Sequence, residues 1–468
     1  MATKKALWSG GFSEKMHPDL AAISDSLEQD FPLADADFRA SSVYALALAR
    51  CGVLNPVEGE KLARTLEELR VEFLNGQWLP HAVEDIHTAI EDEVTLRLGE
   101  LGARLHTGRS RNDQVSTAFR LSVSVFIDSL VLDITALLVQ IAKRATCEVD
   151  TLVPAYTHMQ RAQPVRLAHW ILGYFWPLTR DIERLLEVKV RVLQLPLGAG
   201  AVSGHPFGLD RNWVAEQLGF YGVTQNSIDT VGDRDFALEV THASYMVSMH
   251  LSRMADELVM WSSAEFGYIT WPDALASGSS LMPNKKNPDL VELVRGRVGS
   301  AAGNVMSLMM LLKGLPQSYQ RDLQEDKMPV WDSFKTTSLS VRAMTAAWSD
   351  MIFMPERMSA SLSDDVLATE AADVLVTRGV PFRKAYKAVA MMAAEARKRG
   401  VGLKSLAMAS DYVLPELVSK EDIEGLSVEA ATERRTSVGG TARSAVELQL
   451  RDAYHFLEEV SQLFGVPQ

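Results

Sequence analysis

One segment of the chain concentrates groups that can carry protons and stabilise negative charge. Residues 278–289 read Gly-Ser-Ser-Leu-Met-Pro-Asn-Lys-Lys-Asn-Pro-Asp, with adjacent hydroxyls at Ser279 and Ser280 and adjacent ammonium groups at Lys285 and Lys286. The glycine and the two prolines prevent regular helix or strand, so a mobile loop is predicted. Such a loop offers a proton carrier and the charge needed to stabilise an anion. A solvated basic loop is the alternative on composition alone.

A second polar segment, residues 106–114, stands at the head of the longest predicted helix. Ser110, Arg111 and Asn112 place hydroxyl, guanidinium and amide donors around the N-terminus of that helix. The free backbone N–H groups and the positive end of the helix dipole suit a carboxylate there. A purely structural helix cap, with a basic side chain that binds no ligand, explains the same residues equally well.

Polar groups also crowd residues 156–164, ahead of a predicted apolar helix. The imidazole of His158 can transfer protons near neutral pH, and Thr157 beside it can hydrogen-bond a carboxylate. A structural histidine is the alternative, but the polar neighbours favour the functional interpretation.

Arg234 lies between two aspartates in residues 226–235, just before another long predicted helix. An ion-pair network at the start of that helix explains this pattern at least as well as contact with a substrate does.

Residues 314–327 carry Tyr319, Gln324 and Lys327 among alternating charges. Their helical spacing could present all three side chains on one side. A solvated face is the usual meaning of alternating charge, and it is the alternative here.

Composition narrows the function. Of the 468 residues, 47% are hydrophobic and 23% are charged, which is ordinary for a globular protein. The formal net charge of −13 argues against a nucleic-acid or anionic-membrane surface. An enzyme for a multiply anionic substrate must then concentrate positive charge locally. The candidates within the segments above are Arg109, Arg111, Arg234, Lys285, Lys286, Arg321 and Lys327.

No run of eighteen uncharged apolar residues predicts a transmembrane helix. The first residues lack the apolar core of a signal peptide. Cys51 and Cys147 stand far apart without metal-ligand spacing, so reduced thiols in a cytoplasmic protein are predicted.

The architecture follows from where glycine and proline are absent. Neither residue occurs between Gly108 and Pro154, and apolar residues recur there at three- and four-residue spacing, which predicts one long helix. Helices of this length need one another's apolar faces, so a bundle is predicted. Further runs of this kind cover residues 178–195, 233–266 and 330–354. The prediction is an all-α fold in three mainly helical domains: residues 1–108, a long-helix bundle at 109–357, and residues 358–468.

Several familiar motifs are missing. Residues 198–204 miss the dinucleotide pattern GxGxxG by one residue, and no GxxxxGK[ST] or GxSxG is present. The histidines form neither HxxxH nor HExxH, so neither a catalytic metal nor a cofactor is predicted.

Four strings carry a family resemblance: HTGRSRNDQ at 106–114, YTHMQRAQP at 156–164, GSSLMPNKKNP at 278–288 and KGLPQSYQRDLQEDK at 313–327. Together they resemble the argininosuccinate lyase and δ-crystallin family of the fumarase/aspartase superfamily. The similarity runs from about Trp8 to Ala442, essentially the whole chain. It implies an α-helical homotetramer with a twenty-helix core, whose active sites are each assembled from three subunits.

The resemblance also implies an activity, which is the reversible elimination of fumarate from argininosuccinate to leave arginine. It implies Ser279 as the base, and Lys285 as a stabiliser of the anions that form. His158 is the best candidate for the general acid. The opposite assignment, with His158 as the base and Ser279 as the acid, stays open. Substrate contacts are expected from Ser26, Ser110, Arg111, Asn112, Thr157, Arg234, Asn287, Tyr319, Gln324 and Lys327.

The chain departs from the family pattern at several positions. Gly11 stands where the family has arginine, and Asp25 where asparagine is common, so substrate affinity is less determined than reaction type. The other departures are His205, Gly232, Gln320 and Arg443. Another fumarate-releasing lyase acting on a different N-substituted aspartate, or a non-catalytic crystallin-like relative, is the alternative.

Overall fold

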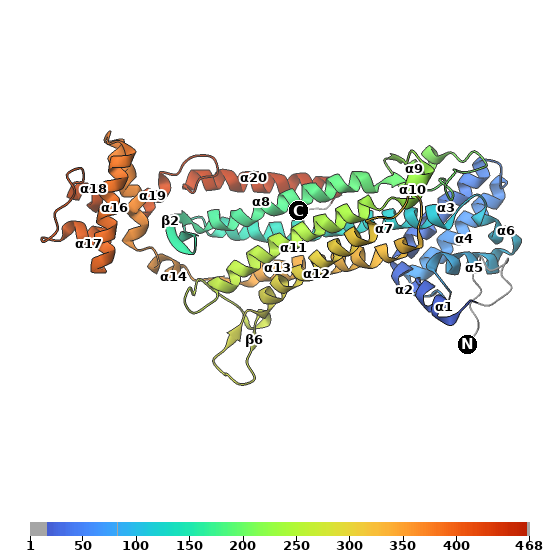
Figure 1. The fold of residues 1–468 in the computed structure, drawn as a ribbon, viewed down its shortest axis with the longest axis horizontal. Coiled ribbons are helices and arrows are strands. Elements are labelled where there is room, and N and C mark those ends of the chain that lie inside the picture. Colours follow the sequence, from blue (N-terminus) through green and yellow to red (C-terminus); the bar gives the residue numbers. More distant parts are fainter. Residues whose placement is uncertain (1–15, 82, 466–468) are drawn as a thin grey trace. The chain divides into compact units, whose positions relative to one another are not determined.

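Helices dominate the computed structural model, which describes residues 16–81 and 83–465 (Figure 1). The strands within these ranges are short and form only two-stranded pairs, so the predicted all-α fold is confirmed. Gly11 and Trp8 lie outside the described residues. The longest helices are α7 (Arg111–Cys147), α8 (Leu167–Val192), α11 (Asp235–Trp261), α12 (Asp289–Leu312) and α13 (Lys327–Asp350).

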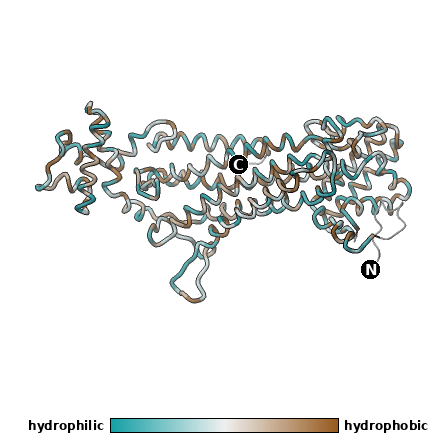
Figure 2. Tube along the Cα trace, in the orientation of Figure 1, coloured by the Kyte–Doolittle hydropathy of each residue, from teal (hydrophilic) through white to brown (hydrophobic). Residues whose placement is uncertain are grey.

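The long helix α7 forms because its apolar residues recur at helical spacing along 37 residues. Val123, Ile127, Leu130, Ile134 and Leu137 are all almost fully buried. Figure 2 shows hydrophobic and hydrophilic positions alternating along the long helices, as amphipathic helices require.

The chain divides into two compact units. The first contains residues 1–132, 181–247 and 298–338. Its shorter helices are α1 (Pro18–Ser24), α2 (Leu27–Asp30), α3 (Ala34–Arg50), α4 (Pro56–Leu74), α5 (Ile86–Leu98), α6 (Glu100–Ala103), α9 (Arg211–Leu218) and α10 (Ser227–Gly232). Its strands β3 (Gln194–Leu195) and β4 (Gly222–Val223) pair in parallel.

The second unit contains residues 133–180, 248–297 and 339–468. Its shorter helices are α14 (Pro355–Ala360), α15 (Ala368–Thr377), α16 (Phe382–Arg399), α17 (Leu403–Met408), α18 (Lys420–Glu424) and α19 (Val428–Glu433), followed by the longer α20 (Arg443–Phe464). Three antiparallel pairs accompany them: β1 (Leu152–Thr157) with β2 (Gln160–Arg166), β5 (Ile269–Thr270) with β8 (Ile352–Phe353), and β6 (Ser277–Gly278) with β7 (Lys286–Asn287). The predicted three-domain division stays a prediction.

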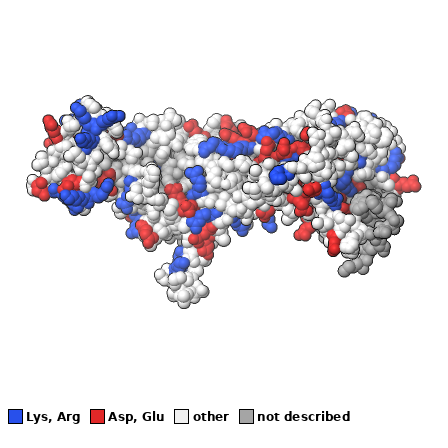
Figure 3. Space-filling model, viewed as in Figure 1, with Lys and Arg blue, Asp and Glu red and all other residues white. Residues whose placement is uncertain are grey.

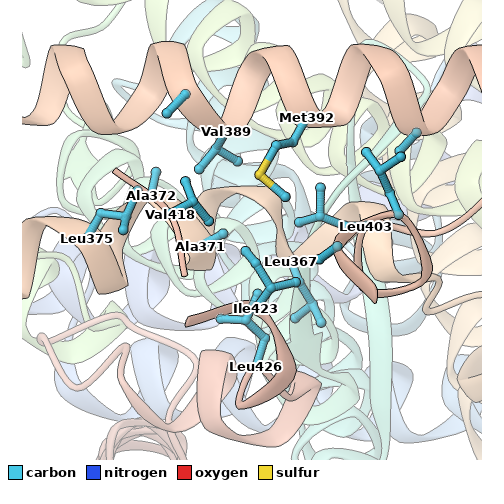
Figure 4. Packing of buried hydrophobic residues seen from close by; sticks show 14 of the residues in the cluster. Leu367, Ala371, Ala372, Leu375, Val389, Met392, Leu403, Val418, Ile423 and Leu426 are labelled. Atoms are coloured by element: carbon cyan, nitrogen blue, oxygen red, sulfur yellow. The ribbon is translucent and has the colours of Figure 1, made fainter. Parts of the chain in front are cut away.

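A separate hydrophobic cluster forms within residues 366–431 of the second unit. Figure 4 shows side chains of α15, α16 and the following segments pointing toward one another, with Met392 among Val389, Leu367 and Leu403. Buried apolar area of this kind is the main favourable term in folding, so these short helices hold one another in place.

Among the described residues, only α7 is long and apolar enough to cross a membrane by length and composition. Two carboxylates within it, Asp128 and Asp133, form ion pairs with Lys189 and Arg342. The core helix of a bundle passes the same test of length and composition, so this helix is weak evidence for a membrane span. On the face drawn in Figure 3, acidic and basic side chains are interspersed.

The bounds of two long helices differ from the helices predicted from the glycine- and proline-free runs. Helix α8 begins at Leu167 and includes Pro177, because Ile171, Phe175 and Leu178 bury a continuous apolar face across the proline. Helix α12 contains glycines and was not predicted.

Candidate active site

The start of α7 is a capped helix terminus built from residues of the predicted site. The backbone N–H of Asn112 donates to Ser110 Oγ at 3.3 Å, and Asp113 Oδ1 accepts from the Ser110 N–H at 3.0 Å. These reciprocal bonds have the pattern of a capping box. They leave the Ser110 hydroxyl proton and the Asn112 amide available for a ligand at the positive end of the helix dipole.

Asp113 fastens this terminus to a glycine-rich loop. Its Oδ2 accepts from the backbone N–H of Gly198 at 3.0 Å and of Gly200 at 2.8 Å. Burial raises the pKa of Asp113 to about 6, although these hydrogen bonds and the one from Ser110 act in the opposite direction. The carboxylate therefore sits in an environment that opposes its charge.

Glu91 on α5 gathers the basic groups of residues 106–111. Its Oε1 lies 2.8 Å from Arg109 Nη2, 3.0 Å from His106 Nδ1 and 3.2 Å from Arg111 Nη1. Burial raises the pKa of Glu91, but the neighbouring His106, Arg111 and Arg109 outweigh it and hold the pKa well below its usual value. Glu91 is therefore ionised and fixes the two guanidinium groups.

Other side chains complete the hold on Arg111. Its Nη1 also donates to Gln114 at 2.5 Å, its Nη2 donates to Thr88 at 3.1 Å, and its Nε is 3.2 Å from Asp85. Much of the donor capacity of Arg111 is thus used within the protein. Its contribution to a bound anion would come mainly through its charge.

A second cluster in the same unit contains Ser26, Gln324 and Lys327. Ser26 Oγ donates to Asp30 at 2.5 Å, and Gln324 Nε2 is 3.4 Å from the carbonyl oxygen of Ser24. Lys327 Nζ is 3.3 Å from Asp326 and 3.6 Å from Asp30. Burial lowers the pKa of Lys327, but these carboxylates outweigh it and raise the pKa above its ordinary value. The lysine is therefore a permanent cation.

Arg234 and Tyr319 lie in this unit as well. Arg234 forms an ion pair with Asp326 in which both side chains are almost completely buried. This arrangement favours the structural alternative for Arg234. Tyr319 is partly buried, and that burial raises the pKa of its hydroxyl, which keeps it protonated as a donor at neutral pH.

Two consecutive acidic residues connect the clusters of the first unit. The carbonyl oxygen of Glu84 accepts from the Ser26 N–H at 2.9 Å, and its carboxylate is 2.9 Å from Arg321 Nη2. The next residue, Asp85, pairs with Arg111. Sequence reasoning did not identify Glu84, Asp85 or Glu91. The acid-rich run at 84–93 was the available signal, since fixed cations require carboxylates to hold them.

Thr157 and His158 stand at the tip of the β1–β2 hairpin in the second unit. Thr157 opposes Gln160, so His158 and Met159 alone form the turn. Both have positive φ, 52° and 59°. Both side chains are exposed, so the described chain leaves the His158 imidazole open to a ligand.

The predicted loop joins β6 to β7 and extends away from the nearby helices of its unit (Figure 1). Ser279 Oγ accepts from the backbone N–H of Leu281 at 3.2 Å and of Met282 at 3.0 Å. Lys285 is exposed, and Asn287 Nδ2 is 3.4 Å from Ser277 Oγ. Two loop N–H groups thus already point at the serine oxygen.

The predicted site residues therefore fall into two sets. The first unit holds Ser26, Ser110, Arg111, Asn112, Arg234, Tyr319, Gln324 and Lys327, and the second holds Thr157, His158, Ser279, Lys285 and Asn287. Among the described residues, no group of three or more His, Cys, Asp and Glu side chains is placed to hold a metal ion.

Comparison with known proteins shows to which family the chain belongs. A family model described as lyase matches residues 10–303, and one described as argininosuccinate lyase C-terminal matches residues 365–433. The argininosuccinate lyase of Schizosaccharomyces pombe is 40% identical over 449 residues, covering 96% of this chain and 97% of the relative. The chain belongs to the argininosuccinate lyase family. The argininosuccinate lyase of Chloroflexus aurantiacus (strain J-10-fl) is 42% identical over 95% of this chain and 96% of its own length.

Solved structures of other proteins share the fold of this chain. EDDS lyase in complex with formate superimposes with a TM-score of 0.83 at 24% identity, covering 93% of this chain and 88% of that one. A class II fumarase from Schistosoma mansoni gives a TM-score of 0.71 at 16% identity, covering 86% of this chain and 90% of that one. These similarities confirm the predicted helical fold of the single chain.

Proposed function

We propose that this protein catalyses the reversible elimination of fumarate from argininosuccinate, leaving arginine, and that it serves arginine biosynthesis in the cytoplasm. The observation that carries the proposal is the 40% identity to an argininosuccinate lyase over 96% of the chain. The side chains that the reaction requires support it, because the four strings that carry the family resemblance contain the proposed base, general acid and anion-stabilising lysine.

The elimination begins at a very weak carbon acid. Removing a proton from the Cβ of the succinyl group creates a carbanion, whose charge moves onto the adjacent carboxylate as an aci-carboxylate. Preorganised donors and cations must hold this dianion, and such stabilisation is usually the largest catalytic term. Lys285, Asn287, Thr157 and the Ser110–Asn112 terminus supply groups of the required kind. This chemistry needs neither a metal nor a cofactor.

Ser279 is proposed as the base. A serine hydroxyl is far too weakly acidic to ionise without help, so its alkoxide must be stabilised. The N–H groups of Leu281 and Met282 already donate to its oxygen. Lys285 would add a full charge, and closure of the loop would remove competing water.

His158 is proposed as the general acid at the leaving guanidinium, directly or through a water molecule. Its exposure and its place in a turn between two strands allow the imidazole to face a bound substrate. In the direction of synthesis the same two groups exchange roles. Ser26, Tyr319, Gln324, Lys327 and Arg234 would line or support the remainder of the substrate site.

We further infer a homotetramer with composite active sites. The support within this chain is an open face on α12. Leu293, Met306 and Met310 are more than half exposed there. A methyl group at Gly296 or Gly303 would meet, within 4 Å, no described atom beyond the neighbouring backbone of its own helix. Large exposed apolar faces mark protein–protein contacts, and glycine allows another helix to approach closely. Copies of the same chain are the proposed occupants.

Fumarate absorbance during incubation with argininosuccinate tests the proposed activity, with adenylosuccinate as the control. Fumarate from argininosuccinate alone is the expected result. Release from adenylosuccinate but not from argininosuccinate would assign the protein to another lyase.

Mixing subunits tests the composite sites. Inactive Ser279→Ala chains and inactive His158→Asn chains, refolded together, should regain part of the activity, because some sites would receive both intact residues. No recovery in tetramers verified to contain both chains would contradict shared sites.

A further inference from the structure

The turn that carries His158 is conformationally costly. His158 and Met159 both have positive φ, and Thr157 opposes Gln160 across them. Two-residue hairpin turns with positive φ at both positions strongly favour Asn-Gly, because a side chain clashes with its own backbone there. Each such residue costs on the order of 1–3 kcal/mol and persists only where the surroundings enforce it.

The hairpin cannot enforce this turn by itself. It has only two strands, and its register is interrupted between Pro154 and Tyr156. An isolated two-stranded hairpin is marginally stable in water. The restraint must therefore come from what the strands contact elsewhere in the second unit. Tyr156 near the tip is hydrogen-bonded to Tyr268 at 2.8 Å, and the base of the hairpin is held separately.

Residues 433–443, which we call the clamp turn, hold the base of the hairpin. Arg166 is the last residue of β2 and pairs with Leu152. Its backbone N–H donates to Thr441 Oγ1 at 2.8 Å, and both residues are buried. Its guanidinium donates to the carbonyl oxygen of Val149 at 2.6 Å and forms an ion pair with Glu433.

The clamp turn is itself rigidly built. The Gly440 N–H donates to the Ser437 carbonyl oxygen at 2.7 Å, and the Ala442 N–H donates to that of Arg435 at 3.1 Å. A methyl group at Gly440 would lie 2.2 Å from the Arg435 carbonyl oxygen, so the turn requires glycine there. Arg435 also pairs with Glu370, whose side chain is 3% exposed. The clamp turn is thus anchored to α15.

We propose that the clamp turn, through the hydrogen bond from Arg166 to Thr441, is a positioning element that keeps the hairpin register and so holds His158 in its strained turn. The inference rests on the proposed function only for its kinetic consequence. Its structural part, that Thr441 controls order at residues 157–160, stands independently of any activity.

The experiment compares Thr441→Val, which keeps the shape but removes the acceptor, with Thr441→Ser, which keeps the hydroxyl. Thr436→Val, at an exposed threonine of the same turn, is the matched control. Hydrogen exchange of residues 152–166 and the kcat and KM for argininosuccinate are measured on assembled protein. We expect Thr441→Val to speed exchange at the hairpin tip at least tenfold and to lower kcat at least tenfold with KM within twofold. The other two variants should match the wild type.

The possible results separate the two proposals. Unchanged hydrogen exchange at residues 157–160 in Thr441→Val would contradict the proposal that the hydrogen bond from Arg166 to Thr441 orders the hairpin tip. Faster exchange with unchanged kcat would overturn its role in positioning His158. If Thr441→Ser and Thr441→Val lost exchange protection and kcat equally, the hydroxyl would not matter. Thr441 would then act only through its packing. A wild-type protein that releases no fumarate would overturn the proposed activity, and tip exchange would still decide the structural part.

Discussion

Glu91 Oε1 lies 2.8 Å from Arg109 Nη2, and the two side chains are only 11% and 1% exposed. The same oxygen also faces Arg111 and His106. One buried carboxylate therefore governs the orientation of a cation expected at the substrate and of a cation fully enclosed behind it.

Replacing Glu91 with glutamine should weaken both folding and substrate binding. Removing one partner of a buried ion pair typically costs about 3–5 kcal/mol, and the retained carbonyl places the expected loss at the lower end. KM for argininosuccinate should rise because Arg111 is no longer held, which steady-state kinetics and thermal unfolding would measure. Glu67→Gln, at an exposed pair with Arg70, is the control and should cost under about 1 kcal/mol. A Glu91→Gln protein with unchanged KM would show that Arg111 is oriented by its other partners.

Because of Asp113, the free energy of unfolding should fall as the pH rises. Its folded-state pKa of about 6 lies above the ordinary value of 3.8, so the folded protein binds this proton more tightly than the unfolded chain. Its contribution is complete below the ordinary value and is lost as pH rises towards 6. Between pH 5 and pH 7 the wild type should therefore lose about 1 kcal/mol relative to Asp113→Asn. Thermal unfolding of both proteins across this range measures the difference. A stability gap that does not vary with pH would mean that Asp113 is charged throughout.

Ser279 and Lys285 should behave as one catalytic unit. Ser279→Ala and Lys285→Met should each reduce turnover by several powers of ten, on the order of 3–4 kcal/mol, because each removes support for a developing anion. Binding of argininosuccinate should change little in Ser279→Ala. The double variant should be little worse than either single one, since losing one partner already disables the other.

The neighbouring residues provide matched controls for that pair. Ser280→Ala and Lys286→Met alter the same loop without touching the proposed base, and they should keep turnover within a few-fold of the wild type. Turnover near the wild-type rate in a folded, assembled Ser279→Ala protein would transfer the base role to His158 or to water.

The loop between β6 and β7 should become ordered when a ligand binds. Its flanking strands have two residues each, and Leu281 at its tip is 84% exposed, so few contacts restrain it in the described chain. Hydrogen exchange at residues 278–288 should slow markedly when fumarate and arginine are added together. Equal exchange with and without saturating products would exclude closure as an ordering step.

The long helices were predictable where apolar periodicity continued without a break. For α7 the absence of glycine and proline located the helix to within a few residues at its start. The same rule missed α12 because this helix contains Gly296, Gly299 and Gly303, and no other part of the described chain packs closely where their side chains would be. It placed the start of α8 too late, because packing of Phe175 and its neighbours tolerates Pro177.

The candidate site was predictable as a set of motifs but not as a set of contacts. The type of each proposed residue indicated its chemistry, and the family resemblance assigned its role. The distant carboxylates that hold these residues, such as Glu91 for Arg111 and Asp30 for Lys327, depend on tertiary neighbours that spacing does not reveal. The turn at His158 and Met159 was equally hidden, because positive φ is uncommon for residues other than glycine and the sequence has no Asn-Gly or Asp-Gly pair there.

If copies of the chain cover the exposed face of α12, as proposed above, that face has a consequence for the protein before it assembles. A newly made chain carries Met306, Met309 and Met310 at its surface, on a helix whose glycines weaken it when nothing packs against them. An unassembled chain of this kind exposes apolar surface that favours non-specific association, and its α12 is locally unstable. We therefore expect chaperones and proteases to recognise it. Substitutions far from any catalytic group, if they slow the encounter of subunits, would reduce the amount of enzyme in the cell rather than the rate of each active site.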